Sequence, residues 1–453
     1  MTNSERIHAG NAALFTDLYQ LTMLQAYVHE GMGEDAVFDL FVRRLGDRNY
    51  LVACGLETVL EFLEDLHFSE EALDYVAAQD VFDDDFLDYL SRFRFTGDVY
   101  AVQEGTPVFA DEPIIEVVAP IGEAQLVETY LLNQITFQTN AATKAGRVRR
   151  AAGDRLVADF GMRRMHGTDA ALKAARAYHV AGLDSTSNVL AGMIYDVPIT
   201  GTMAHSYIEA HDVEEEAFEA FSELFPETIL LVDTYDTLEG VRKVIDLARR
   251  KGDAFDVRGI RLDSGDLAQL AIDSRSLLDE AGLENVKIFA SSSLDEHKIT
   301  ELIDAGAPID GFGVGTRMGT IADQPYLDSA YKLSGYADKP RMKLSSEKSN
   351  LPGQKQVFRT FQDGVASGDV IAAAEETCDG EPLLHQFMRN GQRMPIADVT
   401  LDEIRAHAAE ELERLPERLR GVPKQEPGYD VRLSERLEAR LRETRERLER
   451  EQA

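Results

Sequence analysis

From residue 156 onward the sequence alternates short apolar runs with amphipathic helical patterns, and this alternation limits the possible folds more than any other feature. At least six runs have the length of a strand, and segments with a helical period separate most of them. The expected strands are Leu156 to Asp159, Pro198 to Thr200, Ile229 to Val232, Gly259 to Leu262, Val286 to Ala290 and Gly311 to Val314. Repeated strand-then-helix units indicate a parallel sheet with right-handed crossovers.

Small, polar or charged residues follow each of these six expected strands. The segments are Phe160 to Arg163, Gly201 to His205, Asp233 to Asp236, Asp263 to Asp266, Ser291 to Ser293 and Gly315 to Arg317. A (β/α)₈ barrel builds its active site from the carboxyl ends of many strands, whereas a doubly wound sheet uses one switch point. We therefore expect a TIM-like α/β barrel over residues 151–328, irregular because only six strands are clear.

The flanking segments follow a different pattern. Residues 1–150 mix helices and strands without alternation, which predicts an N-terminal α+β module with a connecting helix. In residues 329–453, Gly, Pro and Asp turns separate short strands, which predicts antiparallel strands that return to the N-terminal module. These strands are expected at Tyr331 to Gly335, Arg341 to Leu344, Gln356 to Phe361 and Asp369 to Ala373, and charged helices follow them.

The charge balance excludes some partners. With 47 basic and 81 acidic side chains, the formal charge is −34. Such a chain repels nucleic-acid backbones and anionic lipid surfaces, so neither is expected as a partner. The acidic residues are spread along the whole chain, as in proteins that stay dispersed in concentrated salt, where the Debye length is about 3 Å at 1 M. This distribution predicts a halophilic source.

Two further features indicate a cytoplasmic protein. The two cysteines cannot form a disulfide scaffold or a Cys-rich zinc site. The first residues lack the basic and apolar regions of a signal peptide, and no run of about 18 apolar residues occurs.

Residues of both charge types follow the expected strands. Arg163 and Arg261 offer guanidinium groups to anionic oxygens, and the carboxylates of Asp233, Asp263 and Asp266 suit a metal, a ribose or a cationic centre. Ordinary ion pairing at strand ends is the alternative. The turn at Gly315 and Thr316 suits a phosphate, although such glycines also form plain turns. His205 is a candidate nucleophile if neighbouring acids orient its ring, and otherwise a structural histidine.

Six segments carry a resemblance to a known family. They are TDLYQLTMLQAY, DFGMRRMHGTDAALKAARAYHVAGLDSTSNVLAG, GTMAHS, RLDSGDL, FGVGTRMGT and PRMKLSSEKSNLPGQKQVFR, between about residues 14 and 361. In content, order and spacing the sequence resembles the nicotinate phosphoribosyltransferases, which are type II phosphoribosyltransferases. The acidic composition favours a member from a halophilic archaeon.

The resemblance implies a reaction and a set of roles. Family members make nicotinate mononucleotide and pyrophosphate from nicotinate and 5-phosphoribosyl 1-pyrophosphate, with Mg²⁺, and couple this to ATP hydrolysis through a phosphohistidine in a homodimer with shared active sites. By the resemblance, Tyr19 of a partner subunit and Phe160 sandwich the pyridine ring. The other implied substrate-binding residues are Arg163, Thr202, Arg261, Gly315 and Thr316. His205 is the phosphorylated residue, Asp263 and Arg261 act in catalysis, and Asp233, Asp263 and Asp266 are metal candidates.

Two alternatives remain open at this stage. Nicotinamide-using relatives carry an acid after the Gly-Thr pair, where this chain has Met203, so nicotinate is the preferred substrate. Arg261 supplies the charge-assisted bond that a carboxylate needs. The second alternative is a catalytically silent paralogue that binds pyridine nucleotides, although His205 and Asp263 are present.

Overall fold

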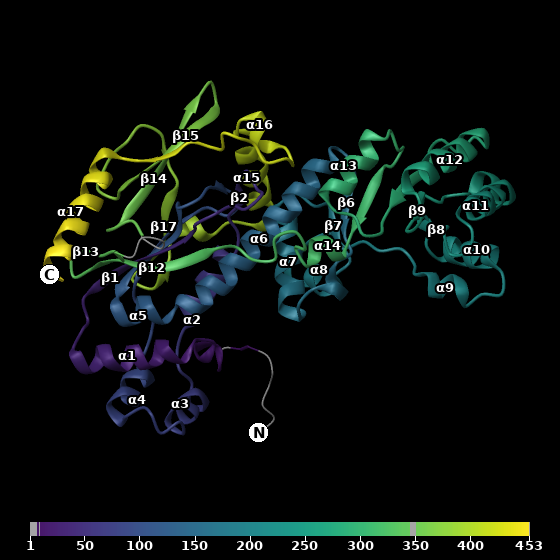
Figure 1. Ribbon diagram of the computed structural model, residues 1–453. Coiled ribbons are helices and arrows are strands. Elements are labelled where there is room, and N and C mark those ends of the chain that lie inside the picture. The colour runs from purple at the N-terminus through teal and green to yellow at the C-terminus, as the bar shows by residue number, and fades with distance from the viewer. Residues whose placement is uncertain (1–6, 9, 345–349, 453) are drawn as a thin grey trace. The chain divides into compact units, whose positions relative to one another are not determined.

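The computed structural model describes residues 7, 8, 10–344 and 350–452 of the chain (Figure 1). The chain forms two compact units. Unit 1 contains the residues up to Asn140 together with those from Tyr326 onward, and unit 2 contains Ala141–Pro325. Each unit is described by itself below.

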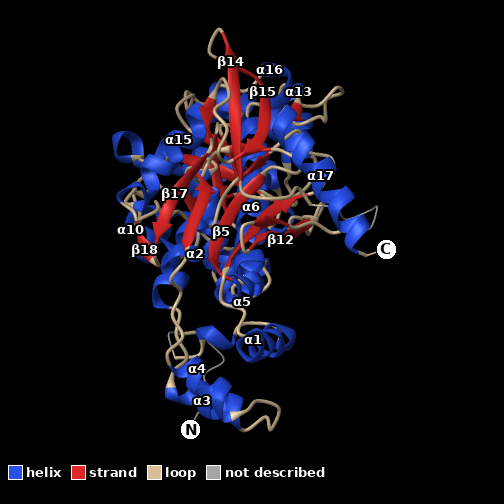
Figure 2. Cartoon of the chain, turned by 90° about the vertical axis from the view of Figure 1, so that its left-hand side faces the viewer, coloured by secondary structure: helices blue, strands red, loops and turns tan. Residues whose placement is uncertain are grey.

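Unit 1 is built on a seven-stranded antiparallel sheet whose strands come from both ends of the chain. Figure 2 labels three of its strands, β17, β5 and β12. Next to β1 lies β12, and Leu40 faces Tyr331 across this pair. The strands, in spatial order, are β13 (Lys339–Pro340), β12 (Ser329–Tyr336), β1 (Asp35–Val42), β5 (Pro113–Pro120), β3 (Asp98–Val102), β17 (Leu384–Arg389) and β18 (Gln392–Arg393).

A second sheet in unit 1 has four strands. Its order is β16 (Glu381–Pro382), β14 (Lys355–Gln362), β15 (Val365–Ala373) and β19 (Val431–Leu433), and β19 runs parallel to β15. A short pair joins β2 (Leu51–Val52) to β4 (Pro107–Val108). The strand predicted at Arg341 to Leu344 is wrong, because those residues form no ladder and the Lys343 amide instead bonds the Asn350 side chain.

Two helices of unit 1, α2 (Leu56–Asp65) and α5 (Ile121–Leu126), pack against strands of the large sheet. In α2 the buried residues Leu56, Val59, Leu60 and Leu63 recur at helical spacing and join the main core. The predicted connecting helix is present as two helices, which are interrupted at Val127. The helices are α1 (Leu18–Glu30), α2 (Leu56–Asp65), α3 (Glu70–Ala77), α4 (Asp84–Ser91), α5 (Ile121–Leu126), α6 (Glu128–Ala152), which continues into unit 2, α15 (Leu401–Glu413), α16 (Glu417–Arg420) and α17 (Glu435–Glu451).

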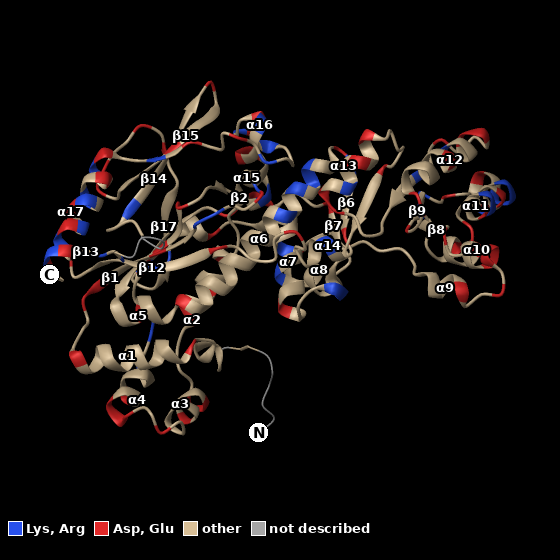
Figure 3. Ribbon diagram, viewed as in Figure 1, with Lys and Arg blue, Asp and Glu red and all other residues tan. Residues whose placement is uncertain are grey.

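The C-terminal helix α17 packs on the surface of unit 1, to which it belongs. It alternates acidic and basic residues along its length, as Figure 3 shows, and the Ser434 side chain caps its start. Leu437 is completely buried against Val357 and Ile371 of the four-stranded sheet. A charged outer face and an anchored leucine are what a surface helix of a folded body requires.

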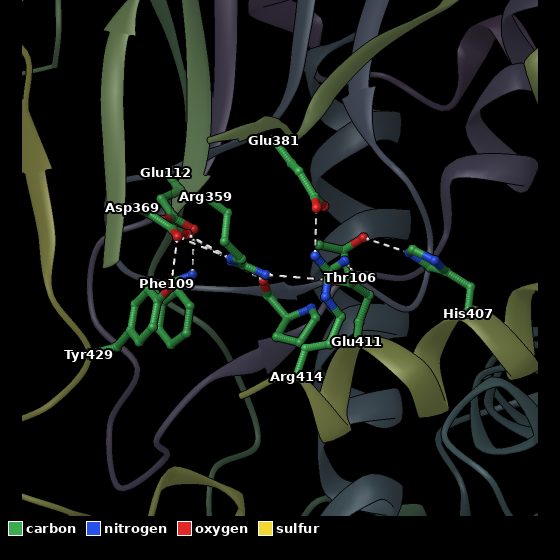
Figure 4. Close-up of polar contacts among 11 residues, drawn as sticks. Thr106, Phe109, Glu112, Arg359, Asp369, Glu381, His407, Glu411, Arg414 and Tyr429 are labelled. Carbon is green, nitrogen blue, oxygen red and sulfur yellow. Dashed lines mark hydrogen bonds and ion pairs between the residues drawn. The ribbon is translucent and has the colours of Figure 1, made fainter. Parts of the chain in front are cut away.

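A buried polar cluster links the C-terminal strands to the N-terminal part of unit 1 (Figure 4). The Arg359 guanidinium donates to both carboxylate oxygens of Asp369, and its Nη2 also donates to the Pro107 carbonyl oxygen at 2.8 Å. The Tyr429 hydroxyl donates to Asp369 Oδ1 at 2.8 Å, and its ring stacks on Phe109. Glu112 also belongs to this cluster, and its Oε2 accepts a hydrogen bond from the Phe109 backbone N–H at 2.8 Å.

Unit 2 contains a six-stranded parallel sheet. Its spatial order is β7 (Ser185–Thr186), β6 (Leu156–Asp159), β11 (Gly311–Val314), β10 (Lys287–Ala290), β9 (Gly259–Leu262) and β8 (Ile229–Leu231). Read from β8, the strands follow chain order up to β11 and then continue with β6 and β7, as they would around a barrel. The sheet is therefore a parallel half-barrel sheet. The segment predicted as a strand at Pro198 to Thr200 forms only one bridge, between Ile199 and Thr186. The two-residue strand β7 was not predicted.

Helices follow the strands of this sheet. They include α7 (Thr168–Val180), α8 (Val189–Tyr195), α9 (His205–Glu209), α10 (Glu214–Leu224), α11 (Thr237–Lys251), α12 (Leu267–Glu280), α13 (Glu296–Asp304) and α14 (Thr316–Gly319). The side chains of Asp236, Asp266 and Asp295 cap α11, α12 and α13. Part of the acidic character after the strands therefore starts the helices, since an N-cap carboxylate accepts an otherwise unbonded backbone N–H.

Candidate active site

Arg261, the third residue of β9, is the centre of the polar contacts at the carboxyl ends of the strands. Its Nε donates to Ser291 Oγ at 2.8 Å and its Nη1 to Thr202 Oγ1 at 3.0 Å. Its Nη2 donates to Asp263 Oδ1 at 2.9 Å. The guanidinium is thus fixed by three side chains: Ser291 follows β10, Thr202 follows the bridge at Ile199, and Asp263 follows β9 itself. Of these, Ser291 was not assigned a role from the sequence, although it directly follows β10.

An aromatic ring lies beside this guanidinium. The Arg261 Cζ atom is 5.4 Å from the centroid of the Phe160 ring. A cavity of about 210 Å³ extends from this ring into the sheet interior. Its lining includes Phe160, Thr202, Arg261, Ser291 and Gly313. A cavity of this size, with a flat apolar face and a cation beside it, suits a small planar anion.

His205 begins α9, close to two carboxylates. Its Nδ1 lies 3.1 Å from the Thr234 hydroxyl, while its Nε2 lies 3.7 Å from Asp263 Oδ2 and 4.0 Å from Asp233 Oδ1. The sequence predicted that acids would orient this ring. The hydrogen-bonding partner is instead Thr234, and the carboxylates lie beyond hydrogen-bond distance of Nε2. The imidazole is 38% exposed, so an incoming reactant can reach it.

Asp263 is an ionised carboxylate in this arrangement. Burial raises the pKa of Asp263, but hydrogen bonds from Ser291 and Arg261 and the positive charge of Arg261 outweigh it, so the net pKa is below the usual value. The neighbouring Asp233 accepts the Asp263 amide and the Ser264 hydroxyl through one oxygen, Oδ2. Its buried Oδ1 accepts no hydrogen bond from the described residues.

The metal candidates separate into two kinds. Asp233 and Asp263 both face His205, so their free oxygens lie on the same side of the site. Asp266 is exposed and uses Oδ1 to cap α12. In the part of the chain that the structure describes, no group of three or more His, Cys, Asp or Glu side chains forms a metal site.

The remaining predicted residues lie in three places. Arg163 is exposed in a short 3-10 helix (Met162–Arg164), and Gly315 and Thr316 follow β11. Tyr19 belongs to unit 1, in the first turn of α1, and is 49% exposed. Met203 is buried and is not among the residues that line the cavity, so its expected part in favouring nicotinate stays a prediction. Only its carbonyl oxygen contacts Arg261, at 3.4 Å.

The fold is a mixed α/β fold with a parallel half-barrel sheet and antiparallel sheets, and the carboxyl ends of the parallel strands bring Arg261, Asp263 and His205 together. Residues 14–136 match the nicotinate phosphoribosyltransferase N-terminal domain, and residues 156–337 match the nicotinate phosphoribosyltransferase family. The chain belongs to the nicotinate phosphoribosyltransferase family, as the resemblance predicted.

Individual relatives agree with this assignment. The chain is 51% identical over 437 residues to nicotinate phosphoribosyltransferase pncB2 of Mycobacterium tuberculosis, which covers 96% of this chain and 94% of that protein. It is 42% identical over 386 residues to the Bacillus subtilis nicotinate phosphoribosyltransferase, covering 83% and 79%. The crystal structure of human nicotinic acid phosphoribosyltransferase matches with a TM-score of 0.84 and 28% identity, over 94% of this chain and 99% of that one.

Within the described residues, no helix combines the length and the apolarity that crossing a bilayer requires.

Proposed function

We propose that this chain transfers the phosphoribosyl group of 5-phosphoribosyl 1-pyrophosphate to nicotinate and releases pyrophosphate, the first step in making NAD from nicotinate. The observation that carries this proposal is the cavity in which Phe160, Thr202 and Arg261 lie together. The names of the close relatives support the same reaction.

Nicotinate would lie against the Phe160 ring with its carboxylate toward Arg261 and Thr202. The Thr202 hydroxyl already accepts a hydrogen bond from Arg261 Nη1. The substrate carboxylate would either accept from Arg261 alongside Thr202 or take the place of Thr202 as the acceptor. A hydrogen bond between an ionised acceptor and an ionised donor contributes about 1.5–3 kcal/mol. Because nicotinamide lacks the charge, this pair favours nicotinate.

The reaction breaks the bond between the ribose anomeric carbon and pyrophosphate, and the pyridine nitrogen forms the new bond to that carbon. Positive charge develops on the ribose as the leaving group departs. We assign its stabilisation to the ionised Asp263, whose pKa is held down by Ser291 and Arg261 against the effect of burial. Arg163, Gly315 and Thr316 would bind the phosphate groups.

Mg²⁺ fits the donor set next to His205. Hard cations prefer carboxylate oxygens and, for Mg²⁺, few protein ligands together with substrate phosphates. The ion would be held by Asp233 Oδ1, which accepts no hydrogen bond from the described residues, and by Asp263 Oδ2, which faces His205. We do not include Asp266 among the proposed ligands, because its side chain caps α12. When bound, Mg²⁺ would neutralise charge on the departing pyrophosphate.

We assign ATP coupling to His205. If its Nδ1–H donates to Thr234, Nε2 keeps the lone pair and is free to attack the γ-phosphorus of ATP. The nitrogen–phosphorus bond forms as the bond to the bridging oxygen of ADP breaks. Water later hydrolyses the phosphohistidine.

A homodimer with shared sites completes the proposal. Helix α8 exposes an apolar face, made of Val189, Leu190, Met193 and Ile194, that a second copy of the chain would cover. A second copy would also supply Tyr19 as the other face of the ring clamp. We infer that the half-barrel sheet works as an irregular barrel, and that the enzyme acts in the cytoplasm, where ATP is available.

The test is a direct assay of the purified full chain in high KCl. The enzyme receives 5-phosphoribosyl 1-pyrophosphate, Mg²⁺ and ATP with nicotinate, nicotinamide or quinolinate in separate reactions, and mononucleotide formation is followed. Nicotinate mononucleotide as the main product supports the proposal. Preference for nicotinamide would favour the alternative substrate, and no product from any of the three would indicate a silent paralogue.

A further inference from the structure

The carboxylate of Asp159 lies directly behind the proposed ring clamp. Asp159 is the last residue of β6, immediately before Phe160, and it is completely buried. No role follows for it from the reaction proposed above. Its two side-chain oxygens nevertheless accept two separate hydrogen bonds, one from the residue after Phe160 and one from Thr186 of β7.

The first bond fixes the chain on both sides of the ring. Asp159 Oδ1 accepts the backbone N–H of Gly161 at 2.7 Å, so the side chain bonds the amide two residues further on. This is an Asx-type turn, which ends an extended segment sharply. The Phe160 amide itself donates to the Val314 carbonyl of β11 at 2.8 Å. Phe160 is therefore held between a strand bond and a side-chain bond.

The second bond attaches this turn to the neighbouring strand. Asp159 Oδ2 accepts the Thr186 hydroxyl of β7 at 2.8 Å. The Thr186 oxygen in turn accepts the Asn188 amide at 3.1 Å, and Asn188 caps α8. The Thr186 hydroxyl therefore donates to Asp159 while its oxygen accepts from Asn188.

We propose that Asp159 is a positioning residue that holds the Phe160 ring at the angle and depth at which it stacks on the pyridine substrate. This inference rests on the proposed function, since it concerns the same cavity. Burial raises the pKa of Asp159 to about 6, and the bonds from Gly161 and Thr186 oppose that rise. The role follows from where the two acceptors lie, not from the charge they carry.

An Asn at this position can keep both links. Its amide oxygen can accept the Gly161 N–H, and its amide nitrogen can donate to the Thr186 oxygen. An Ala keeps neither, and leaves the Gly161 amide without its partner. Comparing the two variants thus separates geometry from charge.

The experiment measures kcat, the KM for nicotinate, the KM for 5-phosphoribosyl 1-pyrophosphate and the melting temperature of the full-length enzyme and its Asp159→Ala and Asp159→Asn variants. We expect Asp159→Ala to raise the KM for nicotinate about 10- to 100-fold, the scale of a misplaced site group. The KM for 5-phosphoribosyl 1-pyrophosphate should change much less, and Asp159→Asn should restore most of the nicotinate KM.

Thr186 provides a matched second pair in case Asp159→Ala does not fold. Thr186→Val removes the hydroxyl and should raise the nicotinate KM, whereas Thr186→Ser keeps the hydroxyl and should not. An unchanged nicotinate KM in Asp159→Ala, an equal rise in both substrate KM values, or an Asp159→Asn enzyme as impaired as Asp159→Ala would overturn the proposal. If Asp159→Ala is unfolded, an unchanged nicotinate KM in Thr186→Val does the same. Failure of the wild-type enzyme to make nicotinate mononucleotide would instead reject the proposed function.

Discussion

The ring of Phe160 lies over the α-carbon of Gly313 on β11. A Cβ atom added at Gly313 would be 2.4 Å from Phe160 Cε2 and 2.5 Å from Cδ2, closer than real contacts allow. Glycine at this position therefore makes room for an aromatic ring at the cavity wall.

Gly313→Ala should displace the ring and weaken nicotinate binding. Overpacking of this kind costs about 1–3 kcal/mol, so we expect the KM for nicotinate to rise roughly 5- to 100-fold if the cost falls on the clamp. The KM for 5-phosphoribosyl 1-pyrophosphate should change less. Gly33→Ala is the control, because a Cβ there meets nothing within 4 Å. Equal kinetics in both variants would mean that the Phe160 position does not matter.

His205→Ala tests the coupling to ATP. The variant removes the only group assigned to accept phosphate, so nicotinate-stimulated ATP hydrolysis and the ATP-dependent gain in rate should both disappear. Circular dichroism and the melting temperature check that the fold is kept. Full ATP stimulation in a folded His205→Ala enzyme would reject the phosphohistidine assignment.

Tyr19 tests the sharing of sites. Tyr19→Ala should raise the KM for nicotinate far more than that for 5-phosphoribosyl 1-pyrophosphate, because ring stacking contributes about 0.5–1.5 kcal/mol beyond burial. When Tyr19→Ala chains are mixed with Arg261→Ala chains, one of the two sites in each mixed dimer should be intact, and activity should partly return. Proven mixed dimers without any rescue would place Tyr19 in the site of its own subunit.

Stability should depend on pH through Glu112. Burial, together with the charge and hydrogen bond of Asp369, raises the pKa of Glu112 well above its usual value, although Arg359 opposes this. At a pH above the ordinary pKa of a glutamate, Glu112 has released its proton in the unfolded chain but still holds it in the folded protein. Stability from this group therefore falls as pH rises toward the folded pKa.

Glu112→Gln should remove that part of the pH dependence. Denaturant midpoints measured between pH 5 and 8 should fall less steeply with pH in this variant than in the wild type, and the residual slope includes Glu116, whose pKa burial also raises. Glu284→Gln makes the same change at an exposed position and should leave the slope unchanged. Parallel slopes in wild type and Glu112→Gln would show that Glu112 is ionised in the folded protein.

Buried strands could be predicted closely from the sequence. The bounds of β6, β9 and β11 agree with the apolar runs. The agreement has a physical reason in β11, where all four residues are buried, because strands buried on both faces are apolar almost throughout. The strand β7 consists of Ser185 and Thr186, which give no apolar signal. It exists because a neighbouring strand supplies its hydrogen bonds, and such long-range pairing cannot be read from a local pattern.

The site was predictable as a set of strand ends but not as a set of contacts. Arg261, Asp263 and His205 do come together, since parallel strands end at one edge. Which partner orients each group depends on side-chain reach across strands, so Thr234 and Ser291 were missed as partners. The cavity is lined by Thr202 and not by its neighbour Met203, a difference of one position that the sequence pattern does not resolve.

The selectivity of Arg261 tests the account most directly. We would measure kcat/KM for nicotinate and for nicotinamide with wild-type enzyme and with Arg261→Gln, which keeps hydrogen-bonding capacity but loses the charge. We expect a strong preference for nicotinate in the wild type. In Arg261→Gln the ratio of kcat/KM for nicotinate to that for nicotinamide should fall about 10- to 100-fold, the equivalent of roughly 1.5–3 kcal/mol. An unchanged ratio would contradict the claim that Arg261 recognises the nicotinate carboxylate.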